Sequence, residues 1–210
     1  MEREGNTEQK VLVAVTGASG TIYAERLIQE LMPRVSRLYI VASETALAVI
    51  PYEMKPLRSS AYSLHSLLKK NSFKGEHAKK LAVFANNDVF APVASGSSAP
   101  DQMVVVPCSM GTLARIRTGV SQSLIERSAD VVMKEGRRLI LCPRETPLSI
   151  LHLENMLSMA KMGVTILPPT PAFYQQPKNM DDLINFVVGK ILEAMGFHHD
   201  LYPAWNKKRC

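Results

Sequence analysis

Short, unbroken runs of apolar residues alternate along the chain with longer segments in which apolar residues recur at helical spacing. A run that is apolar at every position is typical of a strand buried on both faces, whereas the helical period is typical of an amphipathic helix. The apolar runs predict six strands, at residues 11–16, 38–42, 81–84, 103–107, 139–143 and 164–167. The periodic segments predict helices at residues 22–32, 44–50, 61–69, 111–117, 121–135, 148–162 and 180–195.

This alternation predicts a parallel sheet, because two parallel strands need a crossover connection and that connection is usually a helix. The expected fold class is therefore α/β: a doubly wound parallel sheet in a flavodoxin-like or Rossmann-like three-layer α/β/α sandwich. Pro51 is expected to interrupt the helix that begins at residue 44, since proline lacks the N–H group that an interior turn needs. Gly163 is expected to lie just past the end of a helix, and Gly196 to end the last one.

Length and composition indicate one folded unit. The chain has 210 residues, of which 46% are apolar, and this suits a single core rather than a disordered chain. We expect one domain at residues 10–196, a flexible N-terminus at 1–9 and a C-terminal tail at 197–210. No apolar run approaches the roughly 20 residues that cross a bilayer, and no secretory signal is evident. The sequence therefore predicts no membrane association and a cytoplasmic location, which three widely spaced cysteines also favour.

The net charge favours anionic partners. Lys and Arg number 25 against 19 Asp and Glu, which leaves a charge of +6. A modestly basic surface explains this number equally well. The basic clusters at residues 69–80 and 207–209 lack the interleaved aromatic residues and the docking motifs of nucleic-acid-binding proteins. Small phosphorylated ligands are therefore expected rather than nucleic acid.

The residues that follow the strands are the candidate site, because ligands of open parallel sheets bind beyond the carboxyl ends of the strands. Small and hydroxyl-bearing residues stand there at positions 17–20, 43 and 108–112. Gly17-x-Ser19-Gly20 opens a helix whose unpaired N–H groups could hold a phosphate. A tight turn capped by Ser19 explains the same residues equally well. Ser109 has the same two explanations, a helix cap or a ligand contact.

Arg144 and Glu145 directly follow the fifth strand. An arginine at this rim can bind a phosphate and a glutamate can move a proton, although an ordinary ion pair in an interface is the alternative. Cys108 is not expected to be a nucleophile, because no histidine lies near it and a free cysteine at a strand end usually packs. The five histidines lack metal-ligand spacing, so no metal site is expected.

Six segments carry a combined signature: Thr16-Gly17-Ala18-Ser19-Gly20, Ser95-Gly96-Ser97, Pro107-Cys108-Ser109-Met110-Gly111-Thr112-Leu113, Leu124-Ile125-Glu126-Arg127-Ser128-Ala129-Asp130-Val131, Pro143-Arg144-Glu145-Thr146-Pro147 and Pro171-Ala172-Phe173-Tyr174. Together they resemble the UbiX-type flavin prenyltransferases, formerly described as 3-octaprenyl-4-hydroxybenzoate carboxy-lyases. The resemblance extends roughly from Lys10 to Gly196 and is weak only at residues 55–80. Its motifs are specific as a set rather than singly.

The resemblance implies an enzyme that binds FMN and joins the dimethylallyl group of dimethylallyl phosphate to N5 and C6 of the reduced flavin, releasing phosphate. The prenylated FMN would serve a UbiD-type decarboxylase, in ubiquinone biosynthesis or in aromatic acid decarboxylation. The family also implies a homo-oligomer, a dodecamer, with sites between subunits. The sequence does not decide whether the prenyl donor is a monophosphate or a diphosphate.

The resemblance also implies roles for individual residues. The FMN contacts would be Gly17, Ala18, Ser19, Ser43, Ser109, Met110, Gly111, Thr112 and Arg144. The prenyl phosphate would meet Gly96, Arg127, Lys134, Glu145, Tyr174 and Lys190. Lys190 stands where many members have arginine, and lysine lacks the bidentate fork of that side chain. The catalytic residues would be Glu145 as a proton relay, Ser19 at the flavin edge and Glu53 as a second acid.

Two alternatives remain at this stage. One is an FMN-dependent flavoprotein of the cysteine-decarboxylase type, which usually has a catalytic histidine early in the chain. Here no histidine precedes His65. The other is a flavin carrier without chemistry, which the presence of Arg127, Arg144, Glu145 and Tyr174 disfavours.

Overall fold

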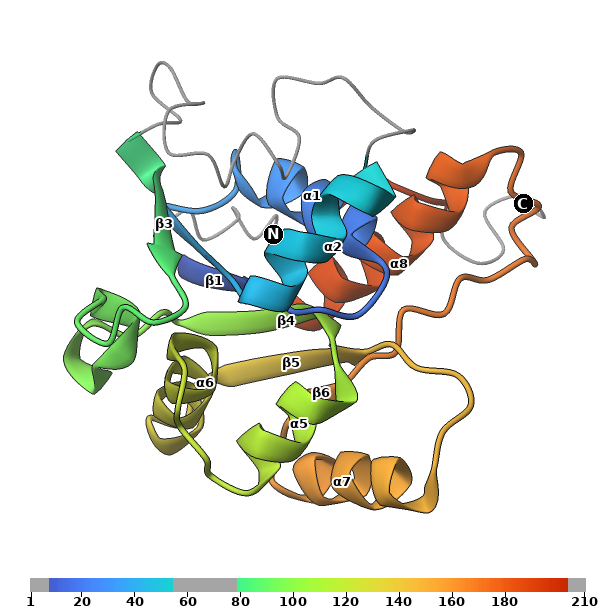
Figure 1. Cartoon of the computed structure of the whole chain (residues 1–210). Helices are drawn as coiled ribbons and strands as arrows, with labels where there is room; N and C mark the ends of the chain where they lie inside the picture. Colours follow the sequence, from blue (N-terminus) through green and yellow to red (C-terminus); the bar gives the residue numbers. More distant parts are fainter. Residues whose placement is uncertain (1–7, 55–78, 204–210) are drawn as a thin grey trace.

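The computed structural model describes residues 8–54 and 79–203, and its centre is a parallel sheet of six strands (Figure 1). Five strands pair in the order β3-β2-β1-β4-β5, with β6 at the far edge. Their bounds are β1 (Lys10–Val15), β2 (Arg37–Ala42), β3 (Leu81–Ala85), β4 (Gln102–Cys108), β5 (Arg138–Pro143) and β6 (Thr165–Ile166). This is the order of a Rossmann sheet, with the switch point between β1 and β4. The predicted doubly wound α/β class is confirmed.

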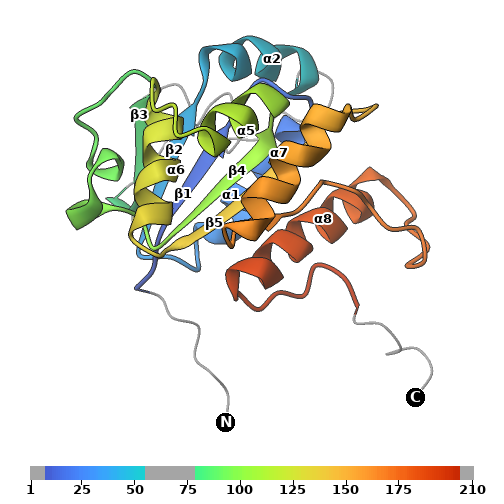
Figure 2. The same ribbon diagram turned by 90° about the horizontal axis from the view of Figure 1, so that it is seen from below.

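Helices cover both faces of the sheet, as Figures 1 and 2 show. One face carries α1 (Thr21–Leu31), α2 (Glu44–Met54) and α8 (Met180–Met195). The other carries α5 (Met110–Arg117), α6 (Leu124–Lys134) and α7 (Ile150–Lys161). Two short 3₁₀ turns, η1 (Pro92–Ala94) and η2 (Gly96–Ser98), lie before β4.

The unbroken apolar strands supply two cores because successive side chains of a strand point to opposite faces. In β1, Val11 and Val13 pack into the core under α1 and α8, whereas Leu12 and Ala14 pack into the core on the opposite face. All four side chains are fully buried. This confirms the interpretation that the strands are covered on both sides.

The second helix departs from its prediction. Instead of stopping at Pro51, α2 continues through it to Met54. Proline leaves the carbonyl of Leu47 without its usual partner, but Glu53 anchors the last turn by accepting hydrogen bonds from Gly20 and Thr21. A tertiary contact therefore overrides the local signal. The helix predicted at residues 61–69 lies outside the described residues.

The ends of several helices follow the local sequence. Gly163 and Gly196 have φ angles of 85° and 82°, a left-handed conformation that glycine adopts without strain.

Within the described residues, no helix is both long and apolar enough to cross a membrane. The division into a domain at 10–196, a flexible N-terminus at 1–9 and a tail at 197–210 stays a prediction, and residues 1–7 and 204–210 lie outside the described residues.

Candidate functional site

The carboxyl ends of β1 and β4 are tied together at the switch point of the sheet. Thr16, which follows β1 and is 1% exposed, donates its hydroxyl to the carbonyl of Pro107 (2.8 Å). The same hydroxyl oxygen accepts the N–H of Ser109 (2.7 Å). Because the chain leaves β1 and β4 toward opposite faces, a crevice opens at this point.

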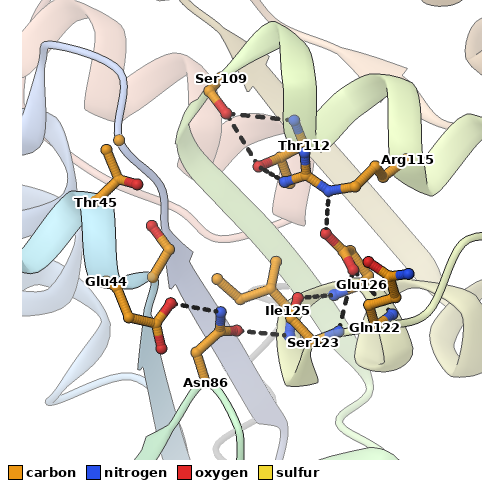
Figure 3. Close-up of a pocket in the computed structure, with 12 residues that line it drawn as sticks. Glu44, Thr45, Asn86, Ser109, Thr112, Arg115, Gln122, Ser123, Ile125 and Glu126 are labelled. Atoms are coloured by element: carbon orange, nitrogen blue, oxygen red, sulfur yellow. Dashed lines mark hydrogen bonds and ion pairs between the residues drawn. The ribbon is translucent and has the colours of Figure 1, made fainter.

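A pocket of about 300 Å³ lies in this crevice (Figure 3). Hydroxyl and amide groups dominate its lining, which comes from the residues after β1, β2, β3 and β4, from α5 and from the start of α6. The lining residues are Gly17, Ser43, Glu44, Thr45, Asn86, Ser109, Thr112, Arg115, Gln122, Ser123, Ile125 and Glu126. The chain thus brings four predicted flavin contacts together here: Gly17, Ser43, Ser109 and Thr112.

Two serines of the pocket act as helix caps as well. Ser109 accepts the N–H of Thr112 (3.3 Å) at the start of α5, and Ser43 accepts the N–H of Ala46 (3.1 Å) at the start of α2. Capping and a position at the pocket therefore coexist. Of the neighbours predicted to touch flavin, Met110 is buried and Gly111 is exposed at the first turn of α5.

Residue 17 must be glycine because the loop after β1 comes very close to Thr45. A Cβ at this position would lie 2.6 Å from the Cβ of Thr45 at the beginning of α2, a distance that side chains do not adopt. The loop after β1 therefore passes directly beside the start of α2. Ala18, which follows, is 8% exposed. A larger residue at Gly17 would push the two walls of the pocket apart.

The beginning of α1 is occupied by Glu53. Its carboxylate accepts the N–H groups of Gly20 (3.0 Å) and Thr21 (2.9 Å) and the hydroxyl of Thr21 (2.7 Å). Partial burial raises the pKa of Glu53, but hydrogen bonds from Ser19, Thr21 and Gly20 outweigh it and hold the pKa below its ordinary value. The explanation of Ser19 as a helix cap is therefore wrong, whereas a phosphate contact of this turn stays a prediction. The N-cap is Gly20, at φ 110°, and a carboxylate of this chain takes the N–H groups.

Arg144 joins the loops after β5 and β1. Its Nε donates to the carbonyl of Ser19 (3.2 Å), so the predicted flavin contact Arg144 and the predicted catalytic Ser19 are neighbours. Glu145 is exposed beside them and accepts the N–H of Thr146 (3.0 Å). Ser19, Glu53, Arg144 and Glu145 thus share one rim of the sheet.

Three residues predicted to bind the prenyl phosphate lie elsewhere, along η2 and α6. Arg127 donates to the carbonyl of Ala94 (3.2 Å). A Cβ at Gly96 would lie 3.2 Å from the Nζ of Lys134, so these two are adjacent. Lys134 ends α6, whose eleven residues span about 16 Å from the pocket at its other end. Lys134 therefore lies at the opposite end of α6 from the pocket.

Tyr174 and Lys190 form a third group, at α8. The rings of Tyr174 and Phe186 meet edge to face at 5.9 Å, and Lys190 Nζ lies 5.9 Å from the centre of the Phe186 ring. A hydrogen bond to Glu193 (2.8 Å) is the main cause that raises the pKa of Lys190 to about 12. Tyr202, from the segment after α8, also donates to Glu193. The predicted tail is therefore packed, in its described part, against α8.

Several pocket residues escaped the sequence reasoning. Asn86 accepts the N–H of Ile125 (3.2 Å) and thereby holds the start of α6. Arg115 and Glu126 form an ion pair across two helices. The capping pattern Ser123-x-x-Glu126 was visible in the sequence, but nothing local placed it beside the end of β4. Burial raises the pKa of Cys108 to about 12, which agrees with its exclusion as a nucleophile.

The pocket suits the phosphate of a flavin mononucleotide. Hydroxyl groups of three segments converge there, and Gly17 keeps space for backbone approach. In the part of the chain that the structure describes, no group of three or more His, Cys, Asp or Glu is arranged to hold a metal ion.

Comparisons with known proteins show the family of this chain. The family model "Flavoprotein" matches residues 1–192. A flavin prenyltransferase UbiX of Halalkalibacterium halodurans is 45% identical over 197 residues, covering 94% of this chain and 93% of the relative. The crystal structure of AnUbiX (PadA1) with FMN and dimethylallyl pyrophosphate superposes with a TM-score of 0.81 at 38% identity, over 95% of this chain and 98% of that one.

A second crystal structure is equally similar. The dodecameric FMN-dependent UbiX-like decarboxylase from Escherichia coli O157:H7 gives a TM-score of 0.79 at 39% identity, over 94% of this chain and 99% of that one. The identity over nearly the full length exceeds what a shared fold alone produces. The chain therefore belongs to the flavoprotein family and, within it, to the UbiX-type flavin prenyltransferases.

Proposed function

We propose that this chain transfers the dimethylallyl group of dimethylallyl phosphate to N5 and C6 of reduced FMN and releases phosphate. The observation that carries this proposal is the hydroxyl-lined pocket at the β1–β4 switch point, beside Ser19, Arg144 and Glu145, in a chain 45% identical to a named flavin prenyltransferase. FMN supplies the nucleophilic atoms of the reaction. The residues of the chain bind, orient and move protons.

The flavin would be held at two points. Gly17, Ser43, Ser109 and Thr112 would surround its phosphate, and Arg144 would contact it from the loop after β5, with Ala18, Met110 and Gly111 beside it. Hydrogen-bond donors from several segments of a rigid sheet orient a ligand without paying for loop ordering at each turnover. The Arg144–Ser19 hydrogen bond would keep the two loops at a constant separation.

Glu145 would be the proton relay. It is exposed at the rim and lies next to Arg144, so its carboxylate can reach a bound ligand and exchange protons with water. Glu53 is ionised and bonded to Ser19, Gly20 and Thr21. We infer that Glu53 acts mainly by ordering the loop that presents Ser19 to the flavin edge.

The leaving phosphate would be stabilised by Gly96, Arg127, Lys134, Tyr174 and Lys190, which supply positive charge and hydrogen bonds where negative charge develops. These residues lie in separate places within one chain, at α6 and at α8. A homo-oligomer, a dodecamer as in the E. coli O157:H7 relative, would complete the site with residues of neighbouring subunits. Apolar side chains that α7 exposes, such as Ile150 and Leu151, offer surface for such an assembly.

The product, prenylated FMN, would pass to a UbiD-type decarboxylase. The neighbour with a bound donor holds a pyrophosphate, dimethylallyl pyrophosphate, so the monophosphate is a specific point to test. A cytoplasmic location remains our proposal and could be checked by cell fractionation.

The decisive experiment is incubation of the purified protein with reduced FMN and either dimethylallyl phosphate or dimethylallyl diphosphate, followed by mass spectrometry of the extracted flavin. We expect a flavin heavier by one prenyl unit with the monophosphate, together with release of inorganic phosphate. Flavin that stays bound but unmodified with both donors would overturn the transferase and leave the flavin carrier. Release of carbon dioxide from a C-terminal cysteine peptide would instead indicate a cysteine decarboxylase.

A further inference from the structure

Arg115 is a charged side chain of the pocket to which the proposed reaction assigns no role. It belongs to the second half of α5, yet its guanidinium lies toward the first turn of that helix, as helical side chains generally do. Nη2 donates to the hydroxyl of Thr112 (3.3 Å), and a Cβ at Gly111 would lie 3.4 Å from Nη1. Figure 3 shows the guanidinium beside Thr112 and Ser109, on the wall opposite Thr45.

A buried carboxylate fixes this position. Glu126 is 4% exposed and accepts hydrogen bonds from Arg115 Nε and from the N–H groups of Gln122 (3.0 Å) and Ser123 (3.0 Å). The two backbone bonds anchor Glu126 to the start of α6. Its pairing with Nε leaves the terminal nitrogens of Arg115 directed at the first turn of α5. The side chain of Arg115 is 47% exposed, but this ion pair and the contact with Thr112 hold its guanidinium at the pocket.

The charge of Arg115 stands at an unusual place. A cation is favoured at the end of a helix and disfavoured near its beginning, where the N–H groups already carry positive charge. Arg117, on the same helix, is exposed and does not line the pocket. Among the described residues that line the pocket, Arg115 is the cation, while Glu44 is turned toward Asn86 (3.4 Å). An anion between Ser109, Thr112 and Arg115 would satisfy the positive charge of both the helix and the guanidinium.

We propose that Arg115, positioned by Glu126, binds the phosphate group of the flavin and makes this chain select FMN over unphosphorylated riboflavin. This proposal rests on the proposed function for the identity of the flavin. The proposal concerns flavin binding rather than prenyl transfer, so an experiment can overturn it without overturning the proposed function, and the reverse. The hydroxyl groups of Ser109 and Thr112 would orient the phosphate, and the fork of Arg115 would supply charge-assisted hydrogen bonds.

The experiment is a titration of the flavin-free protein with FMN and with riboflavin, followed by flavin fluorescence. We expect Arg115→Gln to weaken FMN binding about ten- to hundredfold, the range for a lost charge-assisted contact, and to change riboflavin binding less than about twofold. Arg115→Lys should recover part of the loss, because it restores charge without the fork. The matched control is Arg117→Gln, which removes the same charge from the same helix and should bind FMN like the wild type.

Loss of the partner could also unfold the site, because Arg115→Gln leaves the buried Glu126 carboxylate without its cation. The double variant Arg115→Gln/Glu126→Gln removes both charges and keeps an acceptor for Gln122 and Ser123. We expect it to fold and to show the same lost preference for FMN. Its FMN affinity should also depend less on salt than that of the wild type.

Equal weakening of FMN and riboflavin in the double variant would overturn the proposal, since it would indicate a structural role for Arg115. Unchanged FMN affinity would also overturn it. A wild-type protein that prefers FMN through Arg115 but forms no prenylated flavin would instead overturn the proposed function and leave this inference standing.

Discussion

Two regions of the molecule differ in how their contacts are made. One is the rim at the carboxyl ends of the strands, and the other is a set of outlying cations, Arg127, Lys134 and Lys190. At the rim, bonds join residues far apart in the chain: Gly20 with Glu53, Ser19 with Arg144, and Thr16 with Ser109. The ion pairs of the outlying cations instead join near neighbours in sequence, while Arg127 also donates to the distant carbonyl of Ala94. These pairs are Arg127–Asp130, Lys134–Glu135 and Lys190–Glu193.

This difference distinguishes side chains that the fold holds in place from side chains that remain able to bind a ligand. Contacts between distant segments hold only in the folded chain and fix the loops that would receive the flavin. Exposed pairs between neighbours contribute about 0–1 kcal/mol, so a phosphate can replace the carboxylate at small cost. Under our proposal, the residues that bind the flavin come together within one chain, whereas those that bind the prenyl phosphate would be completed by the ligand and by neighbouring subunits.

The largest expected effect tests the rim itself. Glu145→Gln keeps the size of the side chain but removes the group that exchanges a proton. We expect single-turnover formation of prenylated FMN to slow about a hundred- to ten-thousandfold, measured by quenched-flow and mass spectrometry, with FMN affinity retained. Glu8→Gln, in an exposed position before β1, is the control. An unchanged rate would remove the catalytic role of Glu145.

The next effect tests how closely the walls of the rim pack. Gly17→Ala places a Cβ against Thr45 and should weaken FMN binding about ten- to hundredfold, the effect expected of overpacking. Adding Thr45→Gly removes the contacting atoms and should restore part of the affinity. Fluorescence titration measures both variants. Failure of the second change to restore binding would show that Gly17 serves something other than close approach.

The outlying cations should behave differently. Lys134→Gln and Lys190→Gln should each raise the KM for dimethylallyl phosphate about tenfold, and neither should alter FMN affinity. Steady-state kinetics and flavin titration together separate the two readouts. If Lys134→Gln or Lys190→Gln weakened FMN binding as much as Gly17→Ala does, the distinction between the two regions would be wrong.

Mixed assemblies sharpen this test. If Lys134 and Glu145 of one site come from different subunits, oligomers mixed equally from Lys134→Gln and Glu145→Gln chains would contain about a quarter of intact sites. At a dimethylallyl phosphate concentration well below KM, where Lys134→Gln chains alone keep about a tenth of the activity, recovery to about a quarter of the wild-type rate after mixing is the expected result. A mixture no more active than its components would place both residues in the same subunit.

The smallest expected effect concerns Glu53, whose carboxylate accepts hydrogen bonds from the loop that contains Ser19. Its pKa is lowered, so its stabilising contribution is complete above the unfolded value of 4.5 and is lost as the pH falls through the folded value. Glu53→Gln should reduce the free energy of unfolding by about 1 kcal/mol near neutral pH. Urea denaturation should show this difference shrinking in acid. Parallel stability curves for the two proteins at all pH values would contradict the hydrogen-bonded, ionised carboxylate.

The sequence by itself determined the fold class and the list of rim residues. Unbroken apolar runs such as the one in β1 can only be buried on both faces, and the rule that ligands bind at strand ends then selects Gly17, Ser43, Ser109 and Arg144. Helix ends at Gly163 and Gly196 were equally local. These features depend on patterns of a few consecutive residues, which the sequence displays directly.

Only the tertiary structure decided which side chain accepts the N–H groups at the beginning of α1, how α2 continues through Pro51, and which cation faces the pocket. Glu53 reaches Gly20 across 33 positions, and Arg115 meets Glu126 across 11. No periodicity records such pairs, because they depend on how helices pack against the sheet. The same physics explains why the cations of α6 and α8 lie apart in one chain: spacing along a sequence carries no information about distance between elements.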